Sequence, residues 1–332
     1  MLLKVADRDF LETSEGYFFC VIGNKHPKDR VIAYLKYMKS RRGKWGGRGF
    51  RAERVLKYYT MEFLKDTLEL LKREAPHYLT AIPCVGVFSA VPVSRVIKHY
   101  VPEEKLRSLL SKDEKDPLEA KAASLASMIA EKAGVSVSKM GVTGSILLNM
   151  HNTAFSDIDL TVYGKSEASL VREALIELYS QRLLRRKMDA GVWRTDSIPP
   201  FGLEKLLKRR WNRGEYMGTE FSVLACRERE EIGNLSVHSC VKLGKVVLRA
   251  VIEDDEEGVF YPAIYRIGRV EVLEGDASMK PTELICLSSL YSGTLLSGDA
   301  VEIRGELEVA DGEARVVVGS LSLAGKDYIM LR

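Results

Sequence analysis

The stretch from residue 141 to residue 164, GVTGSILLNMHNTAFSDIDLTVYG, decides the fold that we expect for this chain. Its second half is an apolar run that contains two aspartates, Asp157 and Asp159. Because side chains alternate across a strand, its apolar residues would face a core and both carboxylates the opposite side. Two carboxylates so close repel each other unless a cation lies between them, and their hard oxygens suit Mg²⁺. A pair of solvated aspartates at a strand edge is the alternative.

A glycine and a serine, Gly144 and Ser145, precede the aspartates. The residues before them, VSKMGV, are typical of a strand, and the residues after them, SILLNM, of a short helix. Backbone N–H groups at the start of a helix attract phosphate, and a glycine lets the backbone come close to the anion. An ordinary serine helix cap is the alternative interpretation.

The segments around this stretch predict a small α/β unit over residues 116–235. Asp116 can cap a helix that has Pro117 at its first position, and Gly134 would end that helix. After the aspartate run, EASLVREALIELYSQRLL is typical of a helix and TEFSVLAC of a strand. The order strand, helix, strand, helix, strand indicates an α/β sheet.

The flanking segments predict two further domains, residues 1–115 and 236–332. In the first, FLETSEGYFFCVIG and DRVIAYLKYM are typical of strands and MEFLKDTLELLKREA of a helix, which indicates an α+β domain. The second has short strands separated by turns. It is expected to form a small all-β barrel, OB-like or similar, or a sandwich. The whole chain is therefore expected to be an α+β multidomain protein with the α/β unit at its centre.

Composition limits the class of protein. The 332 residues are 46% apolar and 29% charged, and the net charge of +4 is unevenly spread. Residues 36–57 have nine basic side chains against one acidic, whereas residues 244–332 have sixteen acidic against nine basic. The N-terminus lacks the apolar core of a signal peptide, and no apolar run is long enough for a membrane span. These features predict a cytoplasmic protein without a membrane partner.

The five cysteines are scattered, odd in number and never in a CxxC spacing. This pattern argues against a disulfide scaffold and a cysteine–zinc site, and we expect reduced cysteines in a reducing cytosol. Gln181 is the only glutamine, while lysine, arginine and glutamate are abundant. That bias is typical of heat-adapted proteins and indicates a thermophilic source.

Together, the Gly-Ser turn, eleven intervening residues and the Asp-Ile-Asp run resemble the signature of the DNA polymerase β-like nucleotidyltransferase superfamily. The whole chain resembles an archaeal family of predicted nucleotidyltransferases, with similar segments RDFLETSEGYFFCVIG and HPKDRVIAYLKY near the start. The resemblance implies that Asp157 and Asp159 hold two Mg²⁺ or Mn²⁺ ions against a nucleoside triphosphate. It also implies that Gly144 and Ser145 position the phosphates. A hydroxyl would then attack the α-phosphate, and pyrophosphate would leave.

The superfamily usually supplies a third carboxylate from a later strand. In GTEFSVLAC, Glu220 is the best candidate, since Phe221 and Val223 would face inward and Glu220 outward. Asp189 and Asp196 are alternatives, in a segment that is typical of a loop. Without a third carboxylate, the site would have two carboxylates only, and the inactive alternative would gain support.

Two segments interleave basic residues with aromatic ones, KSRRGKWGGRGFRAER and LEKLLKRRWNRGEY. Arginines on phosphates with an aromatic ring under a base are typical of nucleic-acid binding, so RNA or DNA is a candidate partner. A triphosphate-binding rim or solvated basic loops are the alternatives. The basic residues concerned are Arg41, Arg42, Lys44, Arg48, Arg51, Lys208, Arg209, Arg210 and Arg213.

Three further polar residues have both structural and functional interpretations. His26 precedes a proline in a turn and is expected to be structural rather than catalytic. His151 and Asn152 lie between the Gly-Ser segment and the aspartates, where they would contact the nucleotide or shape the loop.

The sequence therefore predicts metal-dependent transfer of a nucleoside monophosphate to a hydroxyl, with a nucleic acid or another macromolecule as the favoured acceptor. Transfer to a protein side chain or a small molecule is the enzymatic alternative. The non-enzymatic alternative is an inactive protein of this fold that binds nucleic acid or has a regulatory role. The nucleotide, the acceptor and the oligomeric state stay open.

Overall fold

The computed structural model describes residues 4–46, 49–58, 61–188, 198, 200–276, 278–323 and 325–332, without the side chains of residues 61, 62, 200 and 201. The chain is a mixed α+β protein, as predicted, and its residues separate into two compact units. The first unit comprises Met1–Leu56, Ala90–Lys187 and Trp211–Asn234; the second comprises Lys57–Ser89, Met188–Arg210 and Leu235–Arg332. The division into three domains stays a prediction.

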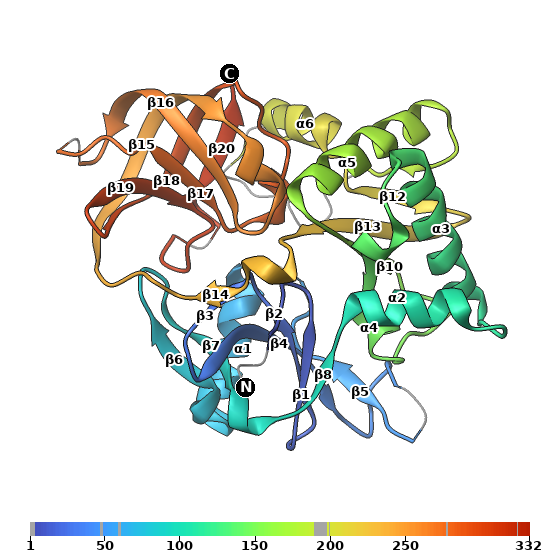
Figure 1. Cartoon of the computed structure of the whole chain (residues 1–332). Coiled ribbons are helices and arrows are strands. Elements are labelled where there is room, and N and C mark those ends of the chain that lie inside the picture. Colours follow the sequence, from blue (N-terminus) through green and yellow to red (C-terminus); the bar gives the residue numbers. More distant parts are fainter. Residues whose placement is uncertain are drawn as a thin grey trace. The chain divides into compact units, whose positions relative to one another are not determined.

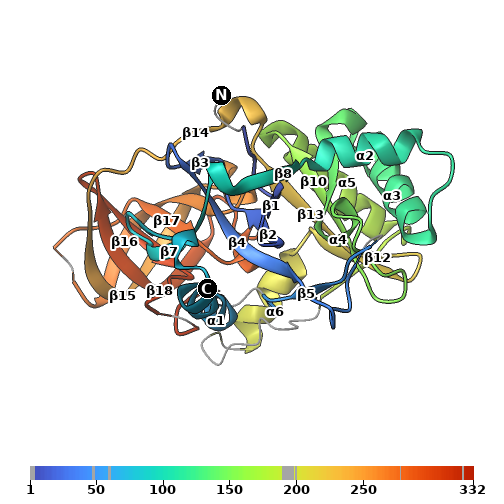
Figure 2. The ribbon, with the colours of Figure 1, turned by 90° about the horizontal axis from the view of Figure 1, so that it is seen from below.

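The first unit begins with an antiparallel sheet. Strands β1 (Phe10–Thr13) and β2 (Tyr17–Val21) lie in the segment predicted to form strands and make a hairpin, in which the Gly16 N–H donates to the Thr13 carbonyl at 2.9 Å. Strand β4 (Arg30–Lys39) is the predicted third strand and pairs with β2. Figure 2 shows β1, β2 and β4 side by side. The neighbouring strands are β8 (Val96–Tyr100), which pairs with β1, and β5 (Ala52–Arg54) and β7 (Gly86–Pro92), which pair with β4.

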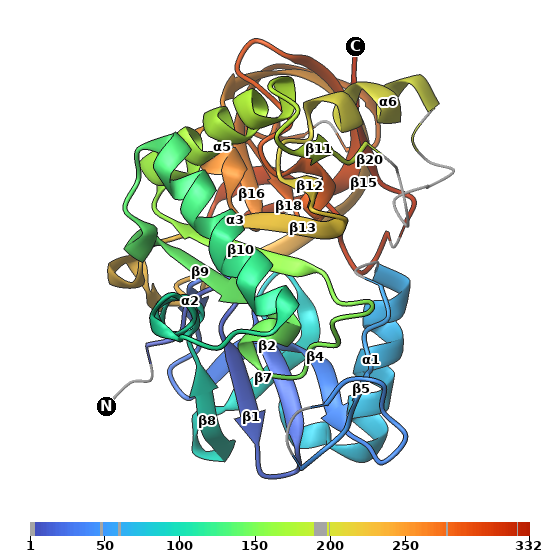
Figure 3. The ribbon, with the colours of Figure 1, turned by 90° about the vertical axis from the view of Figure 1, so that its right-hand side faces the viewer.

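A second sheet of the first unit carries the aspartates. Strand β10 (Ile158–Tyr163) lies between β9 (Met140–Thr143), which is antiparallel to it, and β13 (Thr219–Cys226), which is parallel. The apolar residues of β10 are completely buried, as the alternation predicted. Helices α3 (Pro117–Ala133) and α5 (Lys165–Ser180) lie side by side and pack on the sheet (Figures 1 and 3).

Local signals set the ends of these helices. The Asp116 carboxylate accepts hydrogen bonds from the N–H groups of Leu118 and Glu119, both at 2.9 Å, so the predicted cap of α3 is confirmed. Gly134 ends the helix in the left-handed conformation, with φ 66°. The remaining elements of this unit are α2 (Pro102–Ser111), α4 (Gly144–Leu147), β3 (Lys25–His26), β11 (Arg185–Arg186), β12 (Arg213–Tyr216) and β14 (Gly233–Asn234).

The second unit contains a closed five-stranded barrel. Its strands are β15 (Cys240–Asp254), β16 (Ala263–Glu274), β17 (Glu283–Cys286), β18 (Ala300–Ala310) and β19 (Glu313–Val318), and β20 (Tyr328–Leu331) pairs with β18 outside the ring. The order is β15-β16-β17-β19-β18, and β18 pairs again with β15. Of the two folds that the sequence allowed, barrel or sandwich, the structure is therefore a barrel.

Three further elements belong to the second unit. Helix α1 (Met61–Glu74) lies where the sequence predicted it, and β6 (Leu79–Ile82) pairs with the first half of β7. Helix α6 (Pro200–Arg209) packs on the barrel core through Leu206 and Leu207. Among the described residues, no helix is long and apolar enough to cross a membrane.

The expectation that all cysteines are reduced is wrong for one pair. Cys84 and Cys240, which are 156 residues apart in the sequence, form a disulfide within the second unit. The other cysteines, Cys20, Cys226 and Cys286, are free and buried. Spacing along the chain could not reveal the pair, because the turn after β6 and the start of β15 come together only in the fold.

His26 is structural, as expected. Its side chain is buried, and the backbone N–H of Ile32 donates to its Nδ1 at 3.2 Å, which requires an unprotonated Nδ1. Burial lowers the pKa of His26 to about 4. The unfolded chain, with a histidine pKa near 6.5, takes up this proton at a higher pH than the folded protein does.

We expect acid to destabilise the protein through His26. The folded-state pKa is depressed, so the contribution is full above pH 6.5 and is lost as the pH falls towards 4. The loss should reach about 3 kcal/mol in the free energy of unfolding. Urea unfolding at several pH values measures it. His26→Asn, whose side-chain oxygen can accept the same hydrogen bond, should flatten the profile in this window, and an unchanged slope would contradict the assignment.

Candidate functional site

The two aspartates lie at the start of β10, on the sheet face opposite its apolar residues. Asp159 pairs with Thr143 on β9 and with Ser222 on β13, so three neighbouring strands meet at this level. The Ser222 hydroxyl donates a hydrogen bond to Asp159 Oδ1 at 2.5 Å. Asp157 directly precedes the strand, and both aspartates are only partly exposed.

The two carboxylates have different electrostatic surroundings. The charge on Asp159, followed by burial, raises the pKa of Asp157. Burial also acts to raise the pKa of Asp159, but Lys36, the Ser222 hydroxyl and Arg213 together hold it below its usual value. A divalent cation between the carboxylates would remove the repulsion that raises the Asp157 pKa. The oxygen donors of the pair therefore fit a hard ion such as Mg²⁺ or Mn²⁺.

Basic side chains from distant segments act on this pair. Lys36 comes from β4 and Arg54 from β5, and both lower the pKa values of the two aspartates. Arg213 comes from β12 and pairs in register with Ser222. The Lys36 side chain is buried and its Nζ lies 5.5 Å from the Phe10 ring centre and 5.6 Å from that of Tyr37. Sequence reasoning missed Lys36 and Arg54; the only signal was a lysine inside an apolar strand.

Gly144 lies against one of the aspartates. Its φ is +69°, and a Cβ at this position would be 2.5 Å from Asp159 Oδ2. Glycine adopts this backbone conformation without strain, and it leaves room for the carboxylate because it has no Cβ. Ser145, the next residue, is buried in the short helix α4. The structure thus brings together four of the residues that the signature predicted, Gly144, Ser145, Asp157 and Asp159.

Glu220 lies on the predicted outer face of β13. It directly precedes Phe221, which pairs with Ile158, just as Asp157 directly precedes Ile158. Its side chain is 48% exposed and forms an ion pair with Lys187. Its role as the third carboxylate stays a prediction. The alternatives, residues 189 and 196, lie outside the described residues.

The first basic segment contains two packed aromatic rings. The Phe50 ring stacks on Phe18 with 6.0 Å between ring centres, and Trp45 contacts Tyr37 and Phe155. The basic residues predicted there to contact nucleic acid are exposed, namely Arg41, Arg42, Lys44 and Arg51, while Arg48 lies outside the described residues.

The second basic segment does not form one exposed surface. Trp211 is completely buried and therefore cannot stack on a base in this structure. Arg209 binds the Asp299 carboxylate, and Arg210 is 5% exposed. Lys208 pairs with Glu204 one helical turn away, at 2.7 Å. Arg213, from the same segment, lowers the pKa of Asp159.

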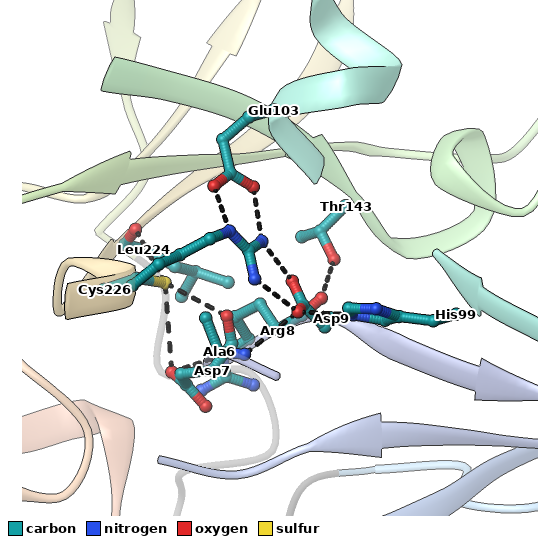
Figure 4. Close-up of polar contacts among 10 residues, drawn as sticks. Ala6, Asp7, Arg8, Asp9, His99, Glu103, Thr143, Leu224 and Cys226 are labelled. Atoms are coloured by element: carbon teal, nitrogen blue, oxygen red, sulfur yellow. Dashed lines mark hydrogen bonds and ion pairs between the residues drawn. The ribbon is translucent and has the colours of Figure 1, made fainter. Parts of the chain in front are cut away.

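A buried ion network lies in the same unit (Figure 4). Two N–H groups of Arg229 donate to Asp9 at 2.8 Å each, and Arg229 also donates twice to Glu103 at 2.7 Å. His99 Nε2 lies 2.7 Å from Asp9, whose side chain is completely buried. Burial acts to lower the pKa of Arg229, but the two carboxylates raise it well above its usual value. The network ties the segment before β1 to α2 and to the segment after β13.

The segment before β1 also contacts Thr143, the residue before the Gly-Ser turn. The Thr143 hydroxyl donates to the Arg8 carbonyl at 2.7 Å, and the Ala6 N–H donates to Asp9 at 2.9 Å (Figure 4). Because Thr143 directly precedes Gly144, the N-terminal segment and the turn are fixed to each other. Sequence reasoning did not identify this network, since its members are separated widely along the chain.

The region between the turn and the aspartates contains His151 and Asn152. His151 Nε2 lies 2.6 Å from Asp116, which also caps α3. The Asn152 side chain accepts a hydrogen bond from the Ala154 N–H at 2.9 Å and so shapes its own loop. The structure therefore gives both residues a structural role, and contact with a nucleotide stays a prediction.

Uncharacterized protein MJ1086 of Methanocaldococcus jannaschii is 31% identical to this chain over 359 aligned residues, which cover 99% of the chain and all of the relative. The chain belongs to the MJ1086 family. No family model matches it, and no solved structure matches it. This relative is archaeal, which agrees with the archaeal origin that the resemblance of the whole chain implied.

Replacing Gly144 by alanine tests its contact with Asp159. Gly134 has nearly the same φ, +66°, but a Cβ there would meet nothing within 4 Å, so Gly134→Ala is a matched control. Both changes add left-handed strain of about 1–2 kcal/mol. We expect Gly144→Ala to lose roughly 1–3 kcal/mol more, because its Cβ overpacks the carboxylate. Urea unfolding measures both, and equal losses would contradict the close contact.

Proposed function

We propose that this protein transfers a nucleoside monophosphate from a nucleoside triphosphate to a hydroxyl acceptor and releases pyrophosphate. The observation that supports this most strongly is the contact between Gly144 and Asp159, in which a Cβ at the glycine would lie 2.5 Å from the carboxylate. It brings the two halves of the nucleotidyltransferase signature together. A glycine there lets a phosphate approach the backbone beside a carboxylate that can bind a metal ion.

The charges around the pair favour a phosphorylated ligand. Asp157 and Asp159 share their surroundings with the cationic side chains of Lys36, Arg54 and Arg213. With divalent ions on the carboxylates, the group as a whole would be strongly positive and would complement the negative charge of a triphosphate. Such ions, when bound, stabilise the developing charge on the attacking and leaving oxygens. Two Mg²⁺ or Mn²⁺ ions are therefore part of the proposal.

The residues of the chain itself would bind and orient the nucleotide. The Gly144 and Ser145 backbone would lie against the phosphates, and Lys36 and Arg54 would neutralise them from β4 and β5. Ser222 holds one oxygen of Asp159, which fixes the orientation of that carboxylate. Glu220 would accept the proton of the attacking hydroxyl if its ion pair with Lys187 opened.

Two observations favour the non-enzymatic alternative. Three cations and the Ser222 hydroxyl already act on the two aspartates, and Glu220 is engaged by Lys187. A protein with this arrangement can keep the fold and bind nucleic acid or regulate a partner without turnover. The two functions differ in turnover, because only the enzyme transfers the nucleotide and releases pyrophosphate.

The test is incubation with Mg²⁺ and each of the four triphosphates, labelled at the α-phosphate, with RNA, DNA or protein as acceptor. The parent protein should transfer label and release pyrophosphate. Asp157→Asn together with Asp159→Asn should reduce the rate by roughly 10²–10³-fold or more, because groups that stabilise transition-state charge are lost. Asp254→Asn together with Asp255→Asn, a pair of adjacent aspartates in the second unit, is the matched control.

The absence of label transfer and pyrophosphate release under every condition would overturn the enzymatic proposal. RNA or DNA binding that survives the double change at Asp157 and Asp159 would then support the alternative. Glu220→Gln tests whether Glu220 is the third catalytic carboxylate. A rate close to that of the parent would exclude Glu220 from the proton transfer.

A further inference from the structure

Two aromatic side chains from distant segments meet near the aspartates, and we name Trp45 and Phe155 the stacking pair. Their rings form an edge-to-face contact with 5.5 Å between centres and 88° between planes. Phe155 lies two residues before Asp157 and is 50% exposed, although it is a large apolar ring. Both residues belong to the first unit.

Trp45 is held from two sides. Its backbone exchanges two hydrogen bonds with Ala52, at 2.7 and 3.2 Å, and its ring contacts Tyr37 with 5.9 Å between centres. Tyr37 pairs in register with Arg54, and it directly follows Lys36. The β4–β5 region that holds Trp45 therefore also carries Lys36 and Arg54, two of the three cations that act on the aspartates.

Phe155 is held by its own loop. The Asn152 carbonyl accepts hydrogen bonds from the N–H groups of Phe155 and Ser156, at 3.2 and 2.9 Å. The Asn152 N–H in turn donates to the Ser156 hydroxyl at 2.9 Å. A further hydrogen bond, from the Gly46 N–H to the Met150 carbonyl at 3.2 Å, joins the two loops. The exposed Phe155 ring is thus presented by a fixed backbone, with its plane set by Trp45.

We propose that the stacking pair binds the base of the nucleotide whose phosphates lie at Asp157 and Asp159. An exposed, immobilised aromatic ring is a surface on which a base stacks, and every base has a π-face. The position fits a nucleotide, because Phe155 is two residues from one aspartate and the Trp45 segment supplies Lys36 and Arg54. This inference rests on the proposed function, which it extends to a base-binding subsite.

The chemistry of the exposed Phe155 ring also predicts low base selectivity. The Phe155 side chain has no hydrogen-bonding group, so it cannot distinguish the polar edges of the bases. We therefore expect adenine, guanine, cytosine and uracil nucleotides to bind with similar affinity. The other aromatic residue of the same basic segment, Phe50, is already stacked on Phe18 and does not take part.

The test measures binding of the four Mg²⁺–triphosphates and of inorganic tripolyphosphate by calorimetry. Phe155→Leu keeps an apolar side chain but removes the π-face. It should weaken the binding of all four nucleotides by roughly 5- to 150-fold. Phe155→Trp should retain affinity within about twofold of the parent, because it restores a stacking surface. Tripolyphosphate, which has no base, should bind the parent and both variants equally. Ile97→Ala, at an apolar residue of β8 that is 60% exposed, is the control and should change nothing.

Each other outcome overturns the inference in a distinct way. If the parent binds triphosphates and Phe155→Leu binds them equally well, the stacking pair is not a base subsite, although the proposed function stands. If Phe155→Leu weakens the binding of tripolyphosphate as much as that of the nucleotides, the change disturbs the phosphate site instead. If Phe155→Leu weakens the binding of a single-stranded oligonucleotide but of no mononucleotide, the base that stacks on Phe155 is one of the acceptor strand and not that of the triphosphate. If the parent binds neither nucleotides nor tripolyphosphate, the proposed function fails as well.

Discussion

The repulsion between Asp157 and Asp159 is the constraint on which the rest of the first unit depends. The apolar side chains of β10 are buried on one face of the sheet. Because side chains alternate along a strand, both carboxylates then lie on the other face. The neighbouring elements accommodate or compensate this negative charge. The β13 strand supplies the Ser222 hydroxyl, the turn after β9 provides a glycine without a Cβ, and β4, β5 and β12 contribute cations.

The N-terminal strands are part of this arrangement because the buried ion network holds them to the aspartate sheet. Arg229 bridges Asp9 and Glu103, and Asp9 is completely buried. Removal of one partner from such a network leaves a buried charge without compensation, which typically destabilises a protein by about 3–5 kcal/mol. The network therefore fixes the sheet that carries Lys36 and Arg54 relative to the aspartate sheet.

Local features of the structure could be predicted from the sequence, and features that depend on distant pairing could not. The alternation in SDIDLTVY predicted the buried face of β10, and Asp116 and Gly134 predicted both ends of α3. Lys36 was not identified, because its relation to the aspartates depends on how two sheets meet. The basic residues around Trp211 suggested an exposed nucleic-acid surface, whereas the structure buries that ring completely. The Cys84–Cys240 disulfide was missed for the same reason, since it joins residues 156 positions apart.

We propose that the aspartate pair is held under repulsion so that it can bind divalent cations, and one comparison of stability tests this proposal directly. At neutral pH with a chelator, Asp157→Asn should unfold at a higher urea concentration than the parent, because a carboxylate whose pKa is raised by its neighbour destabilises the fold when ionised. Addition of Mn²⁺ at 100 times its Kd should then stabilise the parent by about 2.7 kcal/mol and the variant far less, which reverses the order. The contradicting result has two parts: the variant is less stable than the parent with the chelator present, and the parent does not respond to Mn²⁺. This result would show that the basic side chains alone neutralise the pair.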